Sequence, residues 1–541
     1  MKYKFINVDD YITYPQYNVF HPLYAKLIKY SKLDESSIIN LNDDDKLYSK
    51  NPFEYKNMDE IVYILKMAIM SNDKIMVYGN YDADGVCASA IMISLLQKLD
   101  ARVSFYVPSR FNDGFGLNRN VLKAIKDRGF KVLITVDNGM ENKELIRQAK
   151  AYGLKVIVID RHITLGDMPY ANAVLNPKEC DLDEKYVSTS YLCFRVAQAL
   201  SGDSNRYYVS LAAIGTIAAN RPYIGTNNKL IKLGLKYLTH FRFKQMEVLS
   251  VCPYIYSIDV VKNNIITKLE AISRSNSKVD MSIPIKILLS EDIISLEKYE
   301  KELTIHSKKE TKIKNRIIDE IVEDFEYKNQ KCIFIRDKKV GEVESAPLAD
   351  RLYFLYNVPV FVVVDDYMDD SIVKCIAKSH SSFPLNIILR KHTDLVNIFS
   401  GHATSALFTL KKDNVDEFID IINNEVFKLN ARPKGKIIDV IDVKEEEITL
   451  ESVKELLQNG FAIYKNDTCF RLKKIRKDIL QKSVNGYHIS GSLNENVTLV
   501  GYKLAGEYDK IDKEYIDIIF RPEINEFHNS VGVTLHIYFI D

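Results

Sequence analysis

Apolar and polar positions form blocks along the first half of the chain, where short β-branched runs are separated by helical patterns. Residues 132–136 and 155–159 are largely apolar, and a similar run spans 74–77. Strands that are buried on both faces have this pattern. Because strands that alternate with helices over short connections usually form parallel sheets, the pattern from residue 58 to about 220 predicts a parallel sheet with helices on both faces.

The pattern changes twice over the next two hundred residues. Residues 237–292 are largely helical in pattern, and residues 296–324 contain neither Gly nor Pro, so this second segment is expected to form one long connecting helix. Strand patterns return at 332–335 and 358–364. They predict a second α/β domain.

The last hundred residues have a different pattern. Apolar residues occupy every second position from Val531 to Phe539, and another apolar run lies at 516–520. Two such runs across a polar turn predict an antiparallel pair of strands. A basic run at 471–477 precedes them. Two interpretations of this run stay open, namely a nucleic-acid surface and a solvated charged stretch.

Composition limits the class of protein. A length of 541 residues exceeds what one core supports and predicts three to five domains. The hydrophobic content of 46% with 27% charged residues is that of a soluble globular protein. Seven scattered cysteines fit a reducing, cytoplasmic location, and the absence of a long apolar run predicts no membrane span. With a net charge of +1, any nucleic-acid contact must come from local patches.

Acidic residues follow three of the predicted strands. Asp82 and Asp84 come after the first run, Asp137 after the second and Asp160 after the third. Because the carboxyl ends of parallel strands meet at one edge, these side chains are expected to converge. Carboxylates roughly 4 Å apart repel by about 4 kcal/mol at an effective dielectric near 20, and a divalent cation usually holds them together. The alternative is that they only cap helices or shape turns.

Ordered motifs along the chain resemble those of the DHH phosphoesterases and, within that superfamily, the RecJ single-strand-specific exonucleases. The matching segments are Asp82-Ala83-Asp84, Val136-Asp137-Asn138-Gly139, Asp160-Arg161-His162, Asn176-Pro177-Lys178, Ile214-Gly215-Thr216 and Ser400-Gly401-His402-Ala403. The loop at 106–117 is also similar. The resemblance runs from about residue 51 to the C-terminus.

The resemblance implies an α/β fold in which a parallel-sheet DHH domain is joined by a long helix to a second α/β, DHH-associated domain, followed by a C-terminal OB-like β-barrel. The expected boundaries are 1–57 for an N-terminal segment, 58–236 for the DHH domain, 237–325 for the helical region with its connecting helix, 326–430 for the DHH-associated substrate-binding domain and 431–541 for the OB-like nucleic-acid-binding domain.

The resemblance also implies roles for individual residues. One or two Mn²⁺ or Mg²⁺ ions are expected on Asp82, Asp84 and Asp137, with Asp160 and His162 as catalytic groups. The residues expected to bind substrate are Arg110, Arg161, Lys378, Ser400, Gly401 and His402. Two alternatives stay open, because a histidine can be purely structural and an arginine can pair with a neighbouring carboxylate.

Several positions depart from the family pattern. Tyr78 stands where a histidine is usual, Arg161 replaces the first histidine of the DHH triplet, and Ala219 replaces a ligand aspartate. Lys378 stands where arginine is common. A guanidinium has no lone pair to donate and a methyl group cannot coordinate a metal. The substitutions put at least one metal position in doubt.

Two classes of function follow. The first is a RecJ-like hydrolase that degrades single-stranded DNA from 5′ to 3′ in DNA repair or recombination, with RNA not excluded as a substrate. The second is a catalytically degenerate relative that binds single strands or acts as a scaffold among replication or repair proteins. Retention of motifs along the whole chain favours the first class, whereas Arg161 and Ala219 favour the second.

Overall fold

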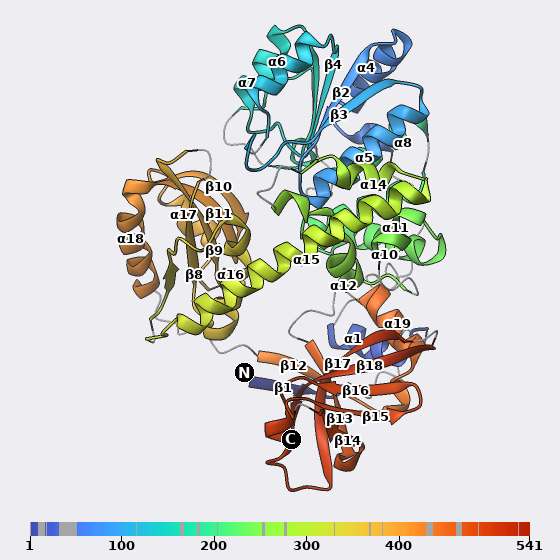
Figure 1. Cartoon of the computed structure of the whole chain (residues 1–541), viewed down its shortest axis with the longest axis vertical. Coiled ribbons are helices and arrows are strands. Elements are labelled where there is room, and N and C mark those ends of the chain that lie inside the picture. The colour runs from blue at the N-terminus through green and yellow to red at the C-terminus, as the bar shows by residue number, and fades with distance from the viewer. Residues whose placement is uncertain are drawn as a thin grey trace.

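The computed structural model of the chain (Figure 1) describes most of the sequence. The described residues are 2–8, 17, 19–31, 51–114, 116–162, 167–180, 184, 186–202, 204–250, 255–274, 279–328, 330–366, 369–380, 382–428, 437–460, 468–484, 486–527 and 530–541. Within them, no helix is both long and apolar enough to span a membrane.

The first domain is built on a five-stranded parallel sheet in the order β3-β2-β4-β5-β6. Its strands are β2 (Lys74–Tyr78), β3 (Arg102–Tyr106), β4 (Val132–Val136), β5 (Lys155–Ile159) and β6 (Ala173–Leu175). Its helices are α4 (Met58–Met70), α5 (Ala83–Lys98), α6 (Arg119–Asp127), α7 (Lys143–Ala151), α8 (Thr189–Ser201) and α9 (Arg206–Ala218). The predicted parallel sheet is confirmed.

Strands β2, β4 and β5 are buried on both faces, because their alternate residues enter different cores, whereas the edge strand β3 is partly exposed. Val77 and Ile157 pack with α4, α5, α8 and α9. Met76 and Val158 face the opposite way and pack with α6 and α7. Figure 1 shows α6 and α7 on one side of the sheet and α4 on the other. This two-sided burial explains why the strands are apolar at nearly every position.

A helical region follows, and its last helix connects two cores. The region contains α10 (Gly225–His240), α11 (Lys244–Leu249), α12 (Ile258–Val260), α13 (Thr267–Leu269), α14 (Ile283–Leu289) and α15 (Ile293–Asp324). In α15, Leu303 packs in the core of the first domain and Ile321 in that of the next. The predicted connecting helix is confirmed. It begins three residues earlier than 296, because the Asp292 side chain accepts a hydrogen bond from the Ser295 amide and caps it.

The second α/β domain has a mixed five-stranded sheet in the order β10-β11-β9-β8-β7. Its elements are β7 (Ile333–Ile335), α16 (Glu342–Tyr356), β8 (Val360–Asp365), β9 (Ile372–Lys378), α17 (Leu385–Arg390), β10 (Val396–His402), β11 (Ser405–Lys411) and α18 (Val415–Lys428). Only β7 and β8 pair in parallel. The domain therefore has the second α/β architecture that the sequence predicts.

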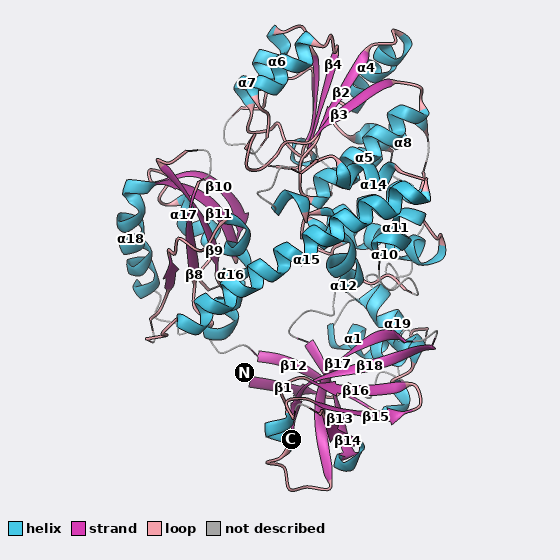
Figure 2. Ribbon diagram, viewed as in Figure 1, coloured by secondary structure: helices cyan, strands magenta, loops and turns pink. Residues whose placement is uncertain are grey.

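The C-terminal domain has a mixed eight-stranded sheet in the order β1-β12-β13-β17-β18-β16-β15-β14. Its elements are β1 (Lys2–Ile6), α1 (Pro22–Ser31), β12 (Ile437–Val443), α19 (Leu450–Asn459), β13 (Thr468–Arg476), β14 (Leu480–Lys482), β15 (Ile489–Asn494), β16 (Val497–Gly501), α20 (Ala505–Tyr508), β17 (Tyr515–Phe527) and β18 (Ser530–Ile540). The predicted antiparallel pair is β17 with β18. Figure 2 shows these strands gathered away from the two α/β domains.

The chain's first residues belong to this C-terminal domain and do not form a unit of their own. β1 pairs in parallel with β12 (Figure 1). The buried Lys26 ammonium on α1 donates to Glu447 at 2.7 Å and to the Asp442 carbonyl at 3.0 Å. Pairing between segments more than 400 residues apart leaves no trace in a local pattern, which explains why the sequence suggested a separate N-terminal segment. The OB-like nature of the domain stays a prediction.

Candidate active site at the strand ends

Two helix N-termini hold the first acidic pair. Asp82 caps α5 by accepting a hydrogen bond from the Gly85 amide at 2.8 Å. Asp84, in the first turn of the helix, accepts from the amides of Thr189 at 3.1 Å and Ser190 at 2.9 Å, which open α8. Helix N-termini favour such carboxylates because their amides lack partners within the helix. Asp84 is thus fixed with two donors already on its oxygens.

A glycine lets the third element approach this point. A Cβ on Gly215 of α9 would lie 2.2 Å from the Ser190 hydroxyl oxygen and 2.7 Å from Asp84 Oδ1. Any side chain there would push α9 away from the acidic pair. Glycine at position 215 therefore allows α9 to pack closely against Ser190 and Asp84.

Asp137 stands at the end of β4 in a left-handed conformation, with φ of 59°. It is fully buried and accepts hydrogen bonds from the Thr189 hydroxyl at 2.6 Å and the Asn80 amide at 3.0 Å. Tyr78, by contrast, turns its hydroxyl to the Gly116 carbonyl at 3.1 Å. Asn80, two residues before Asp82, therefore contacts Asp137, while the Tyr78 hydroxyl bonds elsewhere.

Arg161 lies between two buried carboxylates. Its Nε donates to Asp84 Oδ2 at 3.1 Å and lies 3.6 Å from Asp137 Oδ1. Burial opposes the charged form, yet the Asp137 and Asp84 charges raise the pKa of Arg161 above its ordinary value. We call Arg161 with Asp84 and Asp137 the Arg161 bridge. In this bridge the Arg161 guanidinium supplies the positive charge that a second metal ion would otherwise provide to Asp84 and Asp137.

Asp160 and His162 form a second arrangement beside it. Asp160 Oδ1 contacts His162 Nδ1 at 2.7 Å, and Asp160 Oδ2 accepts from the Met140 amide at 3.2 Å. Burial would lower the pKa of His162, but the Asp160 carboxylate raises it to about 9. Although burial works against it, His162 also lowers the pKa of Asp160. One ligand atom each from Asp137, Asp160 and His162 lie within 4.8 Å of one another.

These three residues, the Asp-Asp-His group, fit one divalent ion. Burial, followed by the neighbouring Asp137 and Asp84 charges, raises the pKa of Asp82 well above its ordinary value, as expected where buried carboxylates crowd together. The Arg161 bridge does not fit a second ion. The Arg161 guanidinium already lies 3.1 Å from Asp84 and 3.6 Å from Asp137, and the Ala219 side chain offers no ligand atom.

The residues expected to bind substrate are more dispersed. Arg110 lies over the Tyr81 ring at 4.9 Å and 3.5 Å from Glu342 on α16, so it links the two α/β domains. Lys378 pairs with Asp350 at 2.7 Å. The 400–402 segment lies in β10 at the edge of the second sheet, and its side chains are outside the described residues.

Two cations near this edge were not among the predicted site residues. Lys178 follows β6, and Arg221 follows the end of α9. Asn176-Pro177-Lys178 was noted only for its order along the chain, and no pattern marks Arg221. Their proximity to Arg161 depends on the tertiary fold.

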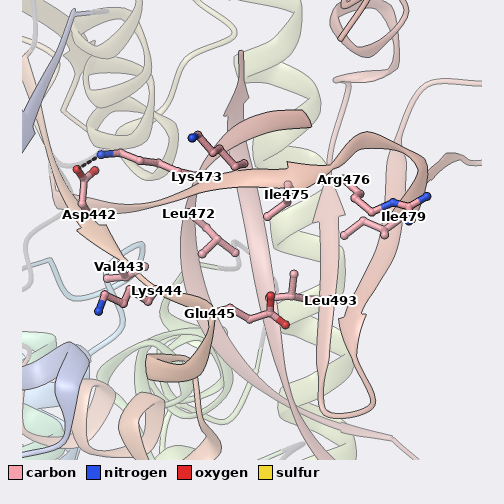
Figure 3. A pocket seen from close by; sticks show the side chains of 11 residues that line it. Asp442, Val443, Lys444, Glu445, Leu472, Lys473, Ile475, Arg476, Ile479 and Leu493 are labelled. Carbon is pink, nitrogen blue, oxygen red and sulfur yellow. Dashed lines mark ion pairs between the residues drawn. The ribbon is translucent and has the colours of Figure 1, made fainter. Parts of the chain in front are cut away.

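The basic run lies on β13 of the C-terminal domain. Arg471 forms hydrogen bonds with Asp442 at 2.7 and 3.0 Å, and Lys473 pairs with the same carboxylate at 2.6 Å. A cavity of about 520 Å³ lies beside these residues, and Lys444 and Arg476 also line it. Figure 3 shows Lys473 turned toward Asp442 on the neighbouring strand. Part of the basic charge is thus neutralised within the protein.

Comparisons with known proteins agree with these motifs. A model described as DHH family, N-terminal domain matches residues 74–216. The single-stranded-DNA-specific exonuclease RecJ of Bacillus subtilis is 30% identical over 503 residues, which cover 88% of this chain and 62% of that protein. The RecJ of Haemophilus influenzae is 23% identical over 551 residues, covering 91% of this chain and 92% of that protein.

The fold agrees as well. The crystal structure of RecJ in complex with Mn²⁺ from Thermus thermophilus matches with a TM-score of 0.76 and 18% identity, covering 100% of this chain and 79% of that one. The chain spans less than two thirds of the length of the Bacillus relative. The chain thus contains a segment that matches the N-terminal domain of the DHH family, is similar to RecJ proteins along most of its sequence, and has a fold like that of a RecJ protein.

Proposed function

We propose that this protein is an exonuclease that hydrolyses phosphodiester bonds of single-stranded DNA from the 5′ end with Mn²⁺ or Mg²⁺. Relatives with similarity along most of the chain bear the name single-stranded-DNA-specific exonuclease. The observation that carries the proposal is the Asp-Asp-His group, whose ligand atoms lie within 4.8 Å of one another at the strand edge. Carboxylates suit Mg²⁺ and Mn²⁺, and the added imidazole favours Mn²⁺ of the two.

The chain's own residues would prepare the phosphate. A divalent ion, when bound, supplies Lewis-acid polarisation of a phosphoryl oxygen. Asp160 fixes the His162 ring through the 2.7 Å contact at Nδ1, as carboxylates commonly orient metal-binding imidazoles. Arg161 holds Asp84 and Asp137 in place and adds a fixed positive charge. The assignment of Asp82 and Asp84 as further ligands stays a prediction.

Substrate binding would exchange ion pairs inside the protein for ion pairs with phosphate. Arg110 now faces Glu342, and Lys378 faces Asp350. A guanidinium prefers a phosphate that it can contact through two donors. The β10 segment with residues 400–402 is proposed as the remaining part of the grip on the strand.

The C-terminal domain is proposed to bind the single strand beyond the cleavage site. Strand β13 offers Lys473, Lys474 and Arg476 at the edge of the 520 Å³ cavity. Phosphate contacts with such cations release counterions, so affinity should fall steeply as salt rises. Replication or repair proteins are the expected partners.

The second candidate function is a single-strand-binding protein that has lost hydrolysis. The Arg161 bridge favours it, because the guanidinium fills the position between Asp84 and Asp137. Loss of the ligand aspartate at Ala219 points the same way.

One experiment separates the two candidates. We would measure Mn²⁺ stoichiometry by calorimetry and cleavage of single-stranded DNA labelled at either end, with an RNA strand of the same sequence in parallel. About one bound ion, as the single fitted group implies, with nucleotides released from the 5′ end, supports the exonuclease. Salt-sensitive DNA binding with no cleavage beyond that of an Asp160→Asn variant supports the binding protein.

A further inference from the structure

Three cations from separate segments meet at the strand edge beside the Asp-Asp-His group. Arg161 follows β5 directly, Lys178 lies in the 3₁₀ turn η4 (Pro177–Glu179) after β6, and Arg221 follows α9. The proposed function assigns no role to the last two.

The sheet brings Lys178 to this position. Ile159 of β5 pairs with Leu175 of β6, so the residues after the two strands are neighbours. Asn176 then joins both loops, because its side-chain amide donates to the His162 carbonyl at 2.8 Å and its oxygen accepts from the Lys178 amide at 3.0 Å.

Helix packing brings Arg221 to the same edge from another direction. Its Nε donates to the Tyr186 carbonyl at 2.7 Å. Two residues later Ser188 caps α8, and its hydroxyl contacts that of Thr216 on α9 at 2.7 Å. The amides that hold Asp84 begin at this same cap.

The three cations lie close enough to act on one another. Burial, followed by Arg221 and Arg161, lowers the pKa of Lys178 to about 8. Burial and Arg161 lower the pKa of Arg221 to about 10. Among the residues that the structure describes, the Lys178 ammonium forms neither a hydrogen bond nor an ion pair. Asp160 opposes the shift of the Lys178 pKa, and Asp84 and Asp137 oppose that of Arg221, but the net shifts are downward. The carboxylates thus offset only part of the repulsion, and a bound anion would relieve the rest.

We propose that Arg161, Lys178 and Arg221 form a phosphate-binding site that works without metal, in place of a second divalent ion. Guanidinium groups contact phosphate through paired donors, and an ammonium adds a point charge. The ligand class is a phosphate group of a nucleic-acid strand. That identity rests on the proposed function, whereas anion binding by the cluster does not.

The test uses the full-length protein in EDTA, so that no metal contributes, and inorganic phosphate as the probe at constant ionic strength. Calorimetry would compare wild type with Lys178→Met, Arg221→Met and the double variant. Each single change should weaken phosphate binding roughly tenfold, since one charge-assisted hydrogen bond is lost. Lys178→Arg keeps the charge and should retain binding.

Lys155→Met is the matched control, because Lys155 is an exposed lysine at the opposite end of β5. It should bind phosphate as wild type does. Circular dichroism and urea unfolding of every variant would show whether the fold is intact.

Equal phosphate affinity in wild type and in the folded double variant would overturn the inference, as would no phosphate binding to the wild type in EDTA. Phosphate binding that depends on Lys178 and Arg221 without any Mn²⁺-dependent cleavage would leave the site standing and reject the exonuclease. Mn²⁺-dependent cleavage, together with phosphate binding that is equal in wild type and the double variant, would reject the phosphate site and leave the exonuclease standing.

Discussion

The Asp-Asp-His group and the Arg161 bridge share Asp137, but their crowded carboxylates differ in the positive group that lies beside them. In the first, the ligand atoms of two carboxylates and an imidazole lie within 4.8 Å of one another. In the second, Arg161 Nε approaches Asp84 at 3.1 Å and Asp137 at 3.6 Å. Removing one partner of a buried ion pair typically costs about 3–5 kcal/mol, so the guanidinium is not easily displaced. The difference teaches that a guanidinium can hold two buried carboxylates together in one place while carboxylates and an imidazole cluster within reach of a single ion in the next.

The shared residue should have the largest effect. Asp137→Asn should reduce Mn²⁺-dependent cleavage of a labelled single strand by roughly 100-fold or more, because it removes a ligand charge. Asp127→Asn, at the exposed end of α6, is the control and should cleave normally. Unchanged cleavage by purified Asp137→Asn protein would mean that the activity comes from elsewhere.

Converting the Arg161 bridge into a metal site would test the comparison directly. Arg161→His with Ala219→Asp introduces an imidazole beside Asp84 and Asp137 and a carboxylate one turn after Gly215, whose Cβ would lie 2.7 Å from Asp84 Oδ1. The double variant should bind about one additional Mn²⁺ in calorimetry, because the ligand count then suffices for a second ion.

Neither single variant should gain the second ion, because each leaves the position one donor short. A wild type that already binds two ions and cleaves at a rate that the double variant does not improve would mean that other groups complete the second position.

A smaller effect is expected at Thr189, whose hydroxyl contacts Asp137, the residue that the two arrangements share. Thr189 donates to Asp137 at 2.6 Å while its amide holds Asp84. Thr189→Val should lower the free energy of unfolding by about 1–2 kcal/mol, since a buried carboxylate loses a donor. Thr189→Ser keeps the hydroxyl and should lose less. Urea unfolding measures the free energy of unfolding of both variants. Equal losses would mean that side-chain packing, and not the hydroxyl hydrogen bond, accounts for the contribution of Thr189.

The smallest effect should come from an ion-pair group that solvent reaches through Lys473, whose side chain is 50% exposed, although Asp442 and Arg471 are largely covered. Burial opposes the shift, but Arg471 and Lys473 lower the pKa of Asp442. A lowered pKa contributes stability above the unfolded pKa, which is lost as the pH falls through the folded value. Asp442→Asn should therefore cost under about 1 kcal/mol at pH 7 and less at pH 3, as measured by urea unfolding. A loss as large as that of Thr189→Val would show that exposure does not weaken the pair.

Local sequence patterns predicted the parts of the fold that depend on residues close together along the chain. Two-sided burial produces the apolar strands β4 and β5, and the absence of Gly and Pro permits the uninterrupted helix α15. The order of strand and acidic loop also placed Asp84, Asp137 and Asp160 at one edge, because parallel strands present their carboxyl ends together.

Other features depend on contacts between distant segments. The sequence alone placed chemistry at the strand ends, but only the fold decided that Asp160 and His162 join Asp137 while Asp84 is held by the amides of α8. Only the fold carried β1 to β12, and Lys178 and Arg221 to the neighbourhood of Arg161. The physical reason is that contacts between distant segments depend on how helices pack and how strands are registered in three dimensions. A residue's neighbours along the chain do not determine these contacts.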